Sequence, residues 1–355
     1  MSHERKSRDD SAALIEKVRA SIDAKAPISI RGGGSKPYPG RHVEAEPVDT
    51  RGHCGIVQYD PTELVITVRA GTPVAELEEV LDEAGQLLPC EPATFGGTAT
   101  VGGMVSTGIA GPRRPWAGSV RDFVLGCRII TGEGKHLRFG GEVMKNVAGY
   151  DVSRLVTGSF GCLGLLTEVS LKVLPKPRAT RSIKLEMQAS EALSSLVEWR
   201  RAGLPITGVC HDNTSLHLRF EGGEASVEAA CVRVGGVADD DSFWRALCEQ
   251  RLAFFNDPRS LWRLSLPPTA PIVELPGTCL LDWGGAQRWL KSDVSPTEVR
   301  ALARQLGGHA TSFSALAIDE PFHPLPPQLM HYHRTLKQQL DPHSIFNPGR
   351  LFADF

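Results

Sequence analysis

PATFGGTATVGGMVS, residues 92–106, is the stretch of sequence that decides the fold. Four glycines fall within eight positions here, at 96, 97, 102 and 103, and the wider segment 85–164 holds 17 of the 36 glycines of the chain. Each ordered glycine costs backbone entropy, so such a density is kept where the backbone must turn with positive φ or approach something closely. We therefore expect a ligand-holding loop here, with a loop-rich β region as the alternative.

Two further glycine segments flank this stretch. RGGGSK, residues 31–36, follows a short strand, and KNVAGYD, residues 145–151, precedes LVTGSFGCLGLLTE, residues 155–168. Successive backbone N–H groups in such loops can hold a pyrophosphate. The Walker pattern G-x-x-x-x-G-K-[ST] and the Rossmann pattern G-x-G-x-x-G are both absent from the sequence. ATP hydrolysis and a nicotinamide site therefore lose their main sequence support.

The first half of the chain predicts mixed helices and strands. Leu14, Val18 and Ile22 indicate an amphipathic helix over 11–23. The β-branched run 64–69 predicts a buried strand, and Thr72 and Pro73 predict the cap and first residue of a helix that runs to about residue 84. A further short strand is expected over residues 28–31. The fold class is therefore α+β or α/β.

The second half begins at Pro175-Lys176-Pro177, which predicts a domain boundary. A β-α-β-β-α order follows and favours an antiparallel sheet with helices on one face. The proline-rich segment 256–276 predicts an extended connection. The expected domains are 1–175, 176–340, and a tail over 341–355. The expected elements are strands 181–187, 205–210 and 214–220 and helices 190–201, 223–233 and 327–340.

Bulk properties narrow the function classes. The 355 residues favour two domains, since one core rarely exceeds about 250–300 residues. The net charge of −2 and the lack of a basic run predict no nucleic-acid partner. A charged N-terminus and the absence of a long apolar run predict a cytoplasmic chain without direct membrane insertion. The eight cysteines form no C-x-x-C pair, which indicates reduced thiols and argues against an iron–sulfur cluster in this chain.

The three glycine segments, in this order, resemble the FAD-binding domain of the vanillyl-alcohol-oxidase (p-cresol methylhydroxylase) superfamily over about residues 25–175. The resemblance implies an α+β fold: a two-part FAD-binding domain, then an α+β cap domain with an antiparallel sheet. It also implies that the first two segments surround the FAD pyrophosphate and that the third lines its adenosine and ribityl side. The cofactor residues implied are Arg31, Gly32, Gly33, Gly34, Ser35, Lys36, Pro92, Thr94, Gly96, Gly97, Thr98, Thr100, Val101, Gly102, Gly103, Ser106, Lys145, Asn146, Gly149, Asp151, Gly158, Gly161, Gly164, Leu166, Thr167 and Asn347.

The C-terminal half resembles a narrower family, the FAD-binding subunits of bacterial glycolate oxidase. The similar segments are 243–247, 261–268 and 282–289, together with the tail DPHSIFNPGR, residues 341–350. This resemblance implies a 2-hydroxy-acid substrate for the complex. It also implies a homologous catalytic flavin subunit and an iron–sulfur subunit as partners, and any membrane association would run through them.

The catalytic groups are harder to find than the cofactor loops. Catalytic relatives carry H-x-G-D-G-N-x-H in the cap domain, often with a metal, whereas this chain has only His211-Asp212-Asn213-Thr214-Ser215-Leu216-His217. We expect strand and turn histidines there, with an acid–base or metal role for His217 as the alternative. No other cluster has metal-ligand spacing, so we expect no metal. Ser35 stands where some relatives link FAD through histidine, which predicts noncovalent FAD.

Arg350 lies in the tail, which folds back near the flavin in the family. It could hold a flavin anion or a carboxylate, or it could cap a domain interface. Three functions stay open: an FAD subunit of a glycolate-oxidising complex, a self-sufficient flavin dehydrogenase of the D-lactate type, and a scaffold that keeps the fold without turnover. The missing histidine motif weakens the second function, and the intact glycine loops weaken the third.

Overall fold

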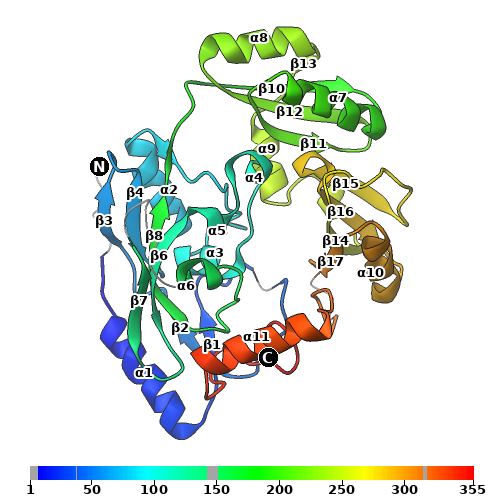
Figure 1. The fold of residues 1–355 in the computed structure, drawn as a ribbon. Coiled ribbons are helices and arrows are strands. Elements are labelled where there is room, and N and C mark those ends of the chain that lie inside the picture. Colours follow the sequence, from blue (N-terminus) through cyan, green and yellow to red (C-terminus); the bar gives the residue numbers. More distant parts are fainter. Residues whose placement is uncertain (1–6, 37, 142–150, 315–317) are drawn as a thin grey trace. The chain divides into compact units, whose positions relative to one another are not determined.

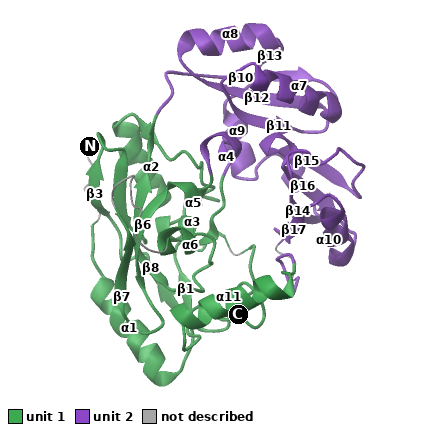
Figure 2. Cartoon of the chain, in the orientation of Figure 1, with its two compact units in different colours: residues 1–110, 119–175, 324–355 green, residues 111–118, 176–323 purple. Residues whose placement is uncertain are grey.

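The chain forms two compact units (Figure 2). The computed structural model describes residues 7–36, 38–141, 151–314 and 318–355. Unit 1 is made of residues 1–110, 119–175 and 324–355, and unit 2 of residues 111–118 and 176–323. The chain therefore passes into unit 2 and returns twice. The change at residue 175 coincides with the proline-rich boundary of the sequence.

Unit 1 is built on a five-stranded sheet of order β3-β4-β8-β6-β7, in which every pair is antiparallel (Figure 1). The expected strand over 64–69 is β4, whose first four residues, VITV, are all buried because neighbours cover both faces. The helix α1 packs Leu14 and Val18 against Ile130 and Leu165 of this sheet. The elements are α1 (Ser11–Ala24), β1 (Ile28–Arg31), β2 (Glu46–Asp49), β3 (Ile56–Asp60), β4 (Val65–Arg69), α2 (Val74–Glu83), β5 (Gln86–Leu87), α3 (Val101–Thr107), α5 (Val120–Phe123), β6 (Val124–Ile130), β7 (His136–Gly140), α6 (Val152–Leu155), β8 (Leu165–Lys172), β9 (Leu174–Pro175) and α11 (Pro327–Leu340).

The last helix, α11, belongs to unit 1, although the sequence placed it at the end of the cap domain. Buried Lys337 is the reason, because its Nζ donates to the carbonyl oxygens of Cys162 and Phe346 and pairs with Asp341 at 2.6 Å. The tail then runs beside β1, where the Ile28 N–H donates to the carbonyl of Ile345. The second domain therefore ends near residue 323 rather than 340.

Unit 2 is an eight-stranded antiparallel sheet of order β13-β10-β12-β11-β15-β16-β14-β17. The expected β-α-β-β-α segment is present within it as β10 to α8. Ser295 caps α10 by accepting a hydrogen bond from the Glu298 N–H. The elements are α4 (Arg114–Ala117), β10 (Ala179–Glu186), α7 (Ala189–Arg201), β11 (Ile206–His211), β12 (Ser215–Gly222), α8 (Glu224–Val234), β13 (Val237–Ala238), α9 (Ser242–Cys248), η1 (Ala253–Asn256), β14 (Ser260–Ser265), β15 (Thr278–Asp282), η2 (Trp283–Gly285), β16 (Gln287–Ser292), α10 (Pro296–Gln305) and β17 (His309–Ser312).

The two faces of this sheet differ in chemistry. Leu216, Leu218 and Phe220 of β12 point into an apolar core shared with α7 and α8. The alternate residues His217, Arg219 and Glu221 must point to the opposite face, because side chains alternate along a strand. All three are nevertheless almost entirely buried, so this second face is polar and covered.

Two local predictions were wrong. Residues 256–276 are not just a connection, because the strand β14 lies within them and pairs with both β16 and β17. The prolines of this segment lie before and after β14 and do not interrupt it. Thr72 does not cap α2; its Oγ1 accepts a hydrogen bond from the Gly55 N–H at 2.8 Å, and the helix begins one residue after Pro73.

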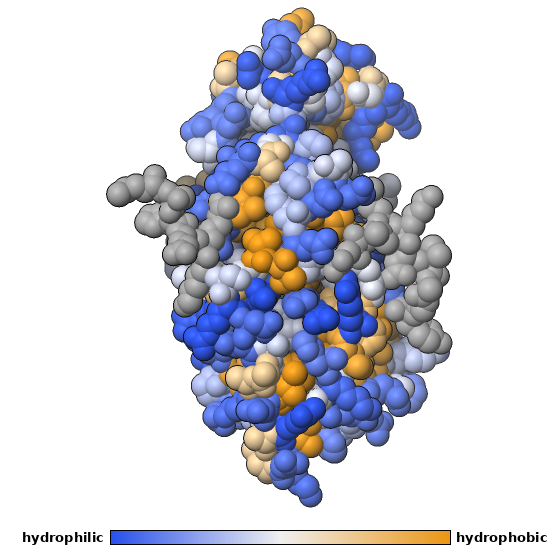
Figure 3. Space-filling view, turned by 90° about the vertical axis from the view of Figure 1, so that its left-hand side faces the viewer, coloured by the Kyte–Doolittle hydropathy of each residue, from blue (hydrophilic) through white to orange (hydrophobic). Residues whose placement is uncertain are grey.

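On the face shown in Figure 3, hydrophobic residues form separate groups among hydrophilic ones. Within the described residues, no helix is both long and apolar enough to span a bilayer.

Candidate functional site

The first glycine loop, residues 32–34, packs directly on the second glycine segment. A Cβ on Gly32 would lie 2.3 Å from Thr100 Oγ1, and one on Gly33 would lie 1.4 Å from the carbonyl oxygen of Thr98. Glycine is therefore needed at both positions for the two segments to meet. The sequence predicted that these segments share a site, and the structure brings them into contact.

A second group of glycines faces open space instead. Gly34, Gly96, Gly97 and Gly158 have positive φ, and a Cβ at any of them would meet nothing within 4 Å. Positive φ favours glycine, and the open space leaves room for another molecule to approach the backbone. In the described part of the chain, the N–H groups of Gly33, Gly34 and Gly96 donate no hydrogen bond. Unpaired donors on adjoining loops are suited to an anion.

The helix α3 holds the second segment in place. Thr100 accepts a hydrogen bond from the Gly103 N–H, and the N–H groups of Val101 and Gly102 donate to the carbonyls of Thr72 and Ala70. These first donors of the helix are thus already used within the protein. A Cβ on Gly102 would lie 2.8 Å from the Ala70 Cβ, so Gly102 permits close packing of helix and strand.

Cationic side chains lie beside the loops. The Lys36 ammonium lies 5.4 Å from the Phe95 ring centroid and donates to Ser35 Oγ at 3.3 Å. Arg31 is exposed at the start of the loop and its Nε donates to Ser29 Oγ. Pro92 and Thr94 are buried beneath the loop, whereas residues 96–98 are exposed. Positive charge next to unpaired N–H groups suits a phosphate-bearing ligand.

The third segment joins the same region through its backbone. The N–H of Gly158 donates to the carbonyl of Val105, and the N–H of Phe160 donates to the carbonyl of Ser106. Farther along, Gly164, Leu166 and Thr167 lie in or next to β8, and the buried Thr167 hydroxyl pairs with His136 at 2.8 Å. Those three residues therefore serve the packing of the sheet.

The other predicted residues of the third segment fall into two groups, those outside the described residues and one that caps a helix. Lys145, Asn146 and Gly149 lie outside the described residues. Asp151 caps α6, accepting from the Arg154 N–H at 3.1 Å and from Ser153 Oγ at 2.8 Å. Burial raises the pKa of Asp151, but these hydrogen bonds bring it below the usual value.

Asn347 and Arg350 place the tail next to the loops. Asn347 Nδ2 donates to the carbonyl of Phe160, and a Cβ on Gly161 would lie 2.6 Å from that nitrogen. Arg350 donates to the carbonyls of Arg41 at 2.6 Å and Lys36 at 3.4 Å, and burial lowers its pKa. Arg350 thus braces the first loop. Sequence analysis missed Lys337 and Asp341, which anchor this tail, although their i, i+4 spacing was a usable signal.

His217, the weak acid–base candidate, is enclosed within unit 2. Its Nδ1 lies 2.6 Å from Asp239 Oδ2 and its Nε2 lies 3.2 Å from Asp212 Oδ2, and its ring stacks on Phe243. The pKa of Asp212 is lowered to about 2, because hydrogen bonds from Ser215, His217 and Thr214 outweigh the effect of burial. Both ring nitrogens are occupied, which favours the structural interpretation.

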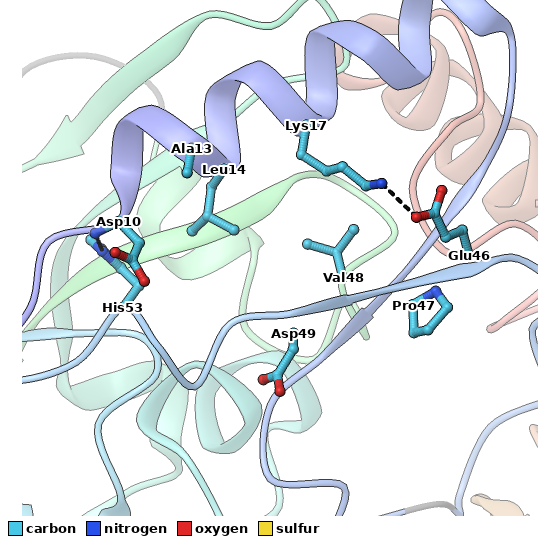
Figure 4. Close-up of a pocket in the computed structure, with 9 residues that line it drawn as sticks. All are labelled: Asp10, Ala13, Leu14, Lys17, Glu46, Pro47, Val48, Asp49 and His53. Carbon is cyan, nitrogen blue, oxygen red and sulfur yellow. Dashed lines mark hydrogen bonds and ion pairs between the residues drawn. The ribbon is translucent and has the colours of Figure 1, made fainter.

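No group of three His, Cys, Asp or Glu side chains could hold a metal ion within the residues that the structure describes. A cavity of about 270 Å³ lies between α1 and β2, lined by Asp10, Lys17, Glu46 and His53 among others (Figure 4). Its charged groups already bond to neighbours: Lys17 pairs with Glu46 at 2.5 Å, and His53 Nδ1 accepts from the Asp10 N–H. The glycine loops, which do not line it, remain the candidate site.

Comparisons with known proteins show what the chain is similar to. The FAD binding domain family matches residues 7–140. Glycolate oxidase subunit GlcE of Escherichia coli (strain K12) is 57% identical over 346 residues, which covers 98% of this chain and 98% of that protein. Glycolate oxidase subunit GlcD of Bacillus subtilis (strain 168) is 33% identical, covering 84% of this chain and 77% of that protein. A solved alkyldihydroxyacetonephosphate synthase has the same fold, with a TM-score of 0.68, 17% identity, and coverage of 95% of this chain and 75% of that one.

Proposed function

The chain belongs to the family of the glycolate oxidase subunit GlcE, and from this premise we propose that it is the FAD-binding subunit of a complex that oxidises glycolate to glyoxylate. It is an FAD-dependent oxidoreductase subunit with an α+β FAD-binding fold, as the sequence predicted. The observation that carries the proposal is the pair of adjoining glycine loops with unpaired N–H groups facing open space.

The residues of the loops fit the FAD pyrophosphate. Gly33, Gly34 and Gly96 supply backbone donors, and Arg31 and Lys36 supply positive charge. Gly102 is among the cofactor residues implied by the resemblance, but the space that its side chain would fill is occupied by Ala70. Bound FAD would accept the hydride that leaves Cα of the 2-hydroxy acid.

The proposal includes noncovalent FAD, since Ser35 follows the first loop where a linking histidine would stand. Acid precipitation of the purified chain should release the yellow chromophore into the supernatant. Flavin left in the pellet would contradict noncovalent binding, and a colourless chain that takes up no added FAD would contradict the cofactor assignment.

We further propose a division of labour among subunits. His217 is enclosed by two carboxylates, and the sequence lacks the H-x-G-D-G-N-x-H motif of catalytic relatives. A general base contributes about 10²–10⁴-fold to a rate. The partners we propose are a homologous catalytic flavin subunit and an iron–sulfur subunit that accepts electrons. Any membrane association would run through these partners.

Anaerobic stopped-flow spectroscopy tests this division. The FAD-loaded chain alone should be reduced slowly or not at all by glycolate or D-lactate, and co-expression with partner subunits should restore oxidation. Rapid, saturable flavin bleaching in the single chain would instead support a self-sufficient dehydrogenase. A reconstituted complex that turns over equally well without FAD on this chain would support the scaffold role.

A further inference from the structure

Residues 111–118 leave unit 1 and form part of unit 2 (Figure 2). Before them, the helix α3 of the second glycine segment ends at Thr107, and only residues 108–110 separate it from unit 2. After them, Ser119 begins α5 back in unit 1, where its N–H donates to the Asp122 carboxylate at 2.7 Å. The helices α3 and α5 contact each other. The segment therefore starts and ends at two packed helices of unit 1, one of which carries glycines of the candidate site.

Trp283 of η2 holds the start of this segment. Its Nε1 donates to the carbonyl of Gly111 at 3.0 Å, and its ring centroid lies 4.4 Å from the Arg114 guanidinium. Trp283 is only 8% exposed, so little water competes for the hydrogen bond. One side chain thus contacts both the backbone and a side chain of segment 111–118.

Other contacts hold the rest of the segment on unit 2. Arg113 forms an ion pair with Glu221 of β12, with Nη2 2.9 Å from Oε1, and both side chains are mostly buried. Trp116 packs against the apolar core that β12 shares with α7. Segment 111–118 therefore cannot shift on unit 2 without breaking several contacts at once.

The turn that presents Trp283 has an unusual backbone. Trp283, Gly284 and Gly285 have φ values of +54°, +64° and +89°. Glycine adopts such values readily, whereas a bulky residue such as tryptophan rarely does. The Trp283 N–H donates to Asp282 Oδ1 at 2.7 Å, and a Cβ on Gly284 would lie 2.9 Å from Leu196 of α7, so close packing fixes the turn. Backbone strain that the surroundings enforce is a reason to look for a role of the strained residue.

We infer that Trp283 is a positioning residue for FAD. By fixing Gly111 on unit 2, it restricts residues 108–110 and the end of α3. The same helix also fixes the third glycine segment, because the Gly158 N–H donates to the carbonyl of Val105. A residue outside the glycine loops thus sets their geometry. The inference rests on the proposed function, because it takes these loops as the FAD site.

Titration of the flavin-free full chain with FAD, followed by flavin fluorescence, tests the inference. Trp283→Phe keeps an aromatic ring beside Arg114 and removes the N–H that bonds to Gly111. The net contribution of one hydrogen bond corresponds to a factor of about two to ten, so the dissociation constant for FAD should rise by about that factor. Arg113→Gln should also weaken FAD binding, because it releases the same segment at a second point.

Trp244→Phe is the matched control. Trp244 is 3% exposed, and its Nε1 donates to Ser182 Oγ at 2.9 Å within unit 2 rather than to segment 111–118. This variant loses the same kind of buried hydrogen bond and should also lower the melting temperature. It should nevertheless keep the FAD dissociation constant of the wild type.

Amide hydrogen exchange gives a readout that a merely structural tryptophan would not change. Coupling between two sites is reciprocal, so FAD should slow exchange in segment 111–118 and in residues 282–287 of the wild type, as well as in the glycine loops. In Trp283→Phe saturated with FAD, the loops should still be protected, but the slowing in unit 2 should be lost.

Three results would overturn the inference. They are equal FAD dissociation constants in the wild type and a folded Trp283→Phe, an equal weakening in Trp244→Phe, and slowing of exchange by FAD that is confined to unit 1 of the wild type. If Trp283→Phe does not fold, Arg113→Gln and the exchange measurement on the wild type decide. A wild-type chain that binds no FAD would instead overturn the proposed function.

Discussion

Asn347 Oδ1 accepts a hydrogen bond from the backbone N–H of Ile30 at 2.7 Å, across 317 residues of sequence. The same side chain donates from Nδ2 to the carbonyl of Phe160. One buried amide therefore joins the strand before the first glycine loop to the third glycine segment. Asn347 also has a φ of +43°, a conformation that asparagine tolerates better than most residues.

Asn347→Ala should weaken both the fold and FAD retention. It leaves the Ile30 N–H and the Phe160 carbonyl buried without their partner, and each such loss costs about 1–3 kcal/mol. Denaturant unfolding and the flavin-to-protein absorbance ratio measure the two effects. Asn347→Asp keeps the acceptor for the Ile30 N–H but sets a carboxylate oxygen against the Phe160 carbonyl, so it should also lose stability, and the loss should shrink as low pH neutralises the carboxyl group. Equal stability of Asn347→Ala and wild type would contradict this role.

Gly33→Ala and Gly34→Ala should distinguish a glycine that is needed for close packing from one that faces open space. The new Cβ at 33 would collide with the carbonyl of Thr98, so the two loops must move apart, at a cost of about 3 kcal/mol or more and with loss of FAD. At 34 the Cβ meets nothing, and the φ of +67° alone costs about 1–2 kcal/mol. Thermal melts with and without FAD compare them. A Gly33→Ala chain as stable as Gly34→Ala would show that the loops do not meet as described.

Gly102→Ala should destabilise through Ala70 rather than through FAD. Its Cβ would lie 2.8 Å from the Ala70 Cβ and 3.0 Å from the Ala70 carbonyl oxygen, an overpacking of about 1–3 kcal/mol. Ala70→Gly in the same chain should restore part of that loss, giving a favourable coupling energy in a double-mutant cycle. Additive effects of the two changes would rule out the contact.

Lys337→Met should be among the more damaging single changes in unit 1. It leaves the fully buried Asp341 carboxylate without its cation, a type of loss worth about 3–5 kcal/mol. The double variant Lys337→Met with Asp341→Asn should recover part of this, because no charge then remains buried. Urea unfolding of the wild type, the single variant and the double variant measures the free energy of unfolding of each. Equal losses of this free energy in the single and double variants would show that the buried charge is not the cause.

Acid should weaken unit 2 through Asp212. Its pKa of about 2 in the folded chain lies below the ordinary value of 3.8, so its stabilising contribution is complete above about pH 4 and is lost as pH falls toward 2. Asp212→Asn should therefore be less stable than wild type at neutral pH, and the difference should shrink near pH 2. Melting curves across this range test it. A difference that stays constant with pH would point to lost packing instead.

Local sequence signals predicted the elements of this chain well. The strand over 28–31 and the helix over 327–340 have the predicted bounds, because residue patterning and flanking prolines fix them locally. The packing partner of a helix or strand could not be predicted in the same way. Nothing near α11 in the sequence shows that Lys337 bonds to the carbonyl of Cys162, so its place in unit 1 could not be predicted.

The glycines illustrate the same limit within the site. Their density predicted that a backbone comes close to something, and not what that something is. Gly34 and Gly102 look alike in sequence, yet one faces open space and the other faces Ala70.

The strand before the first glycine loop is completed by residues 345–347, which follow it much later in the sequence. Ile28 takes its hydrogen bonds from both sides of this tail: its N–H donates to the carbonyl of Ile345, and its carbonyl accepts from the N–H of Asn347. During translation, the first glycine loop is synthesised hundreds of residues before these partners. The strand that leads into this loop therefore gains its full set of hydrogen bonds only after residues 345–347 have been synthesised.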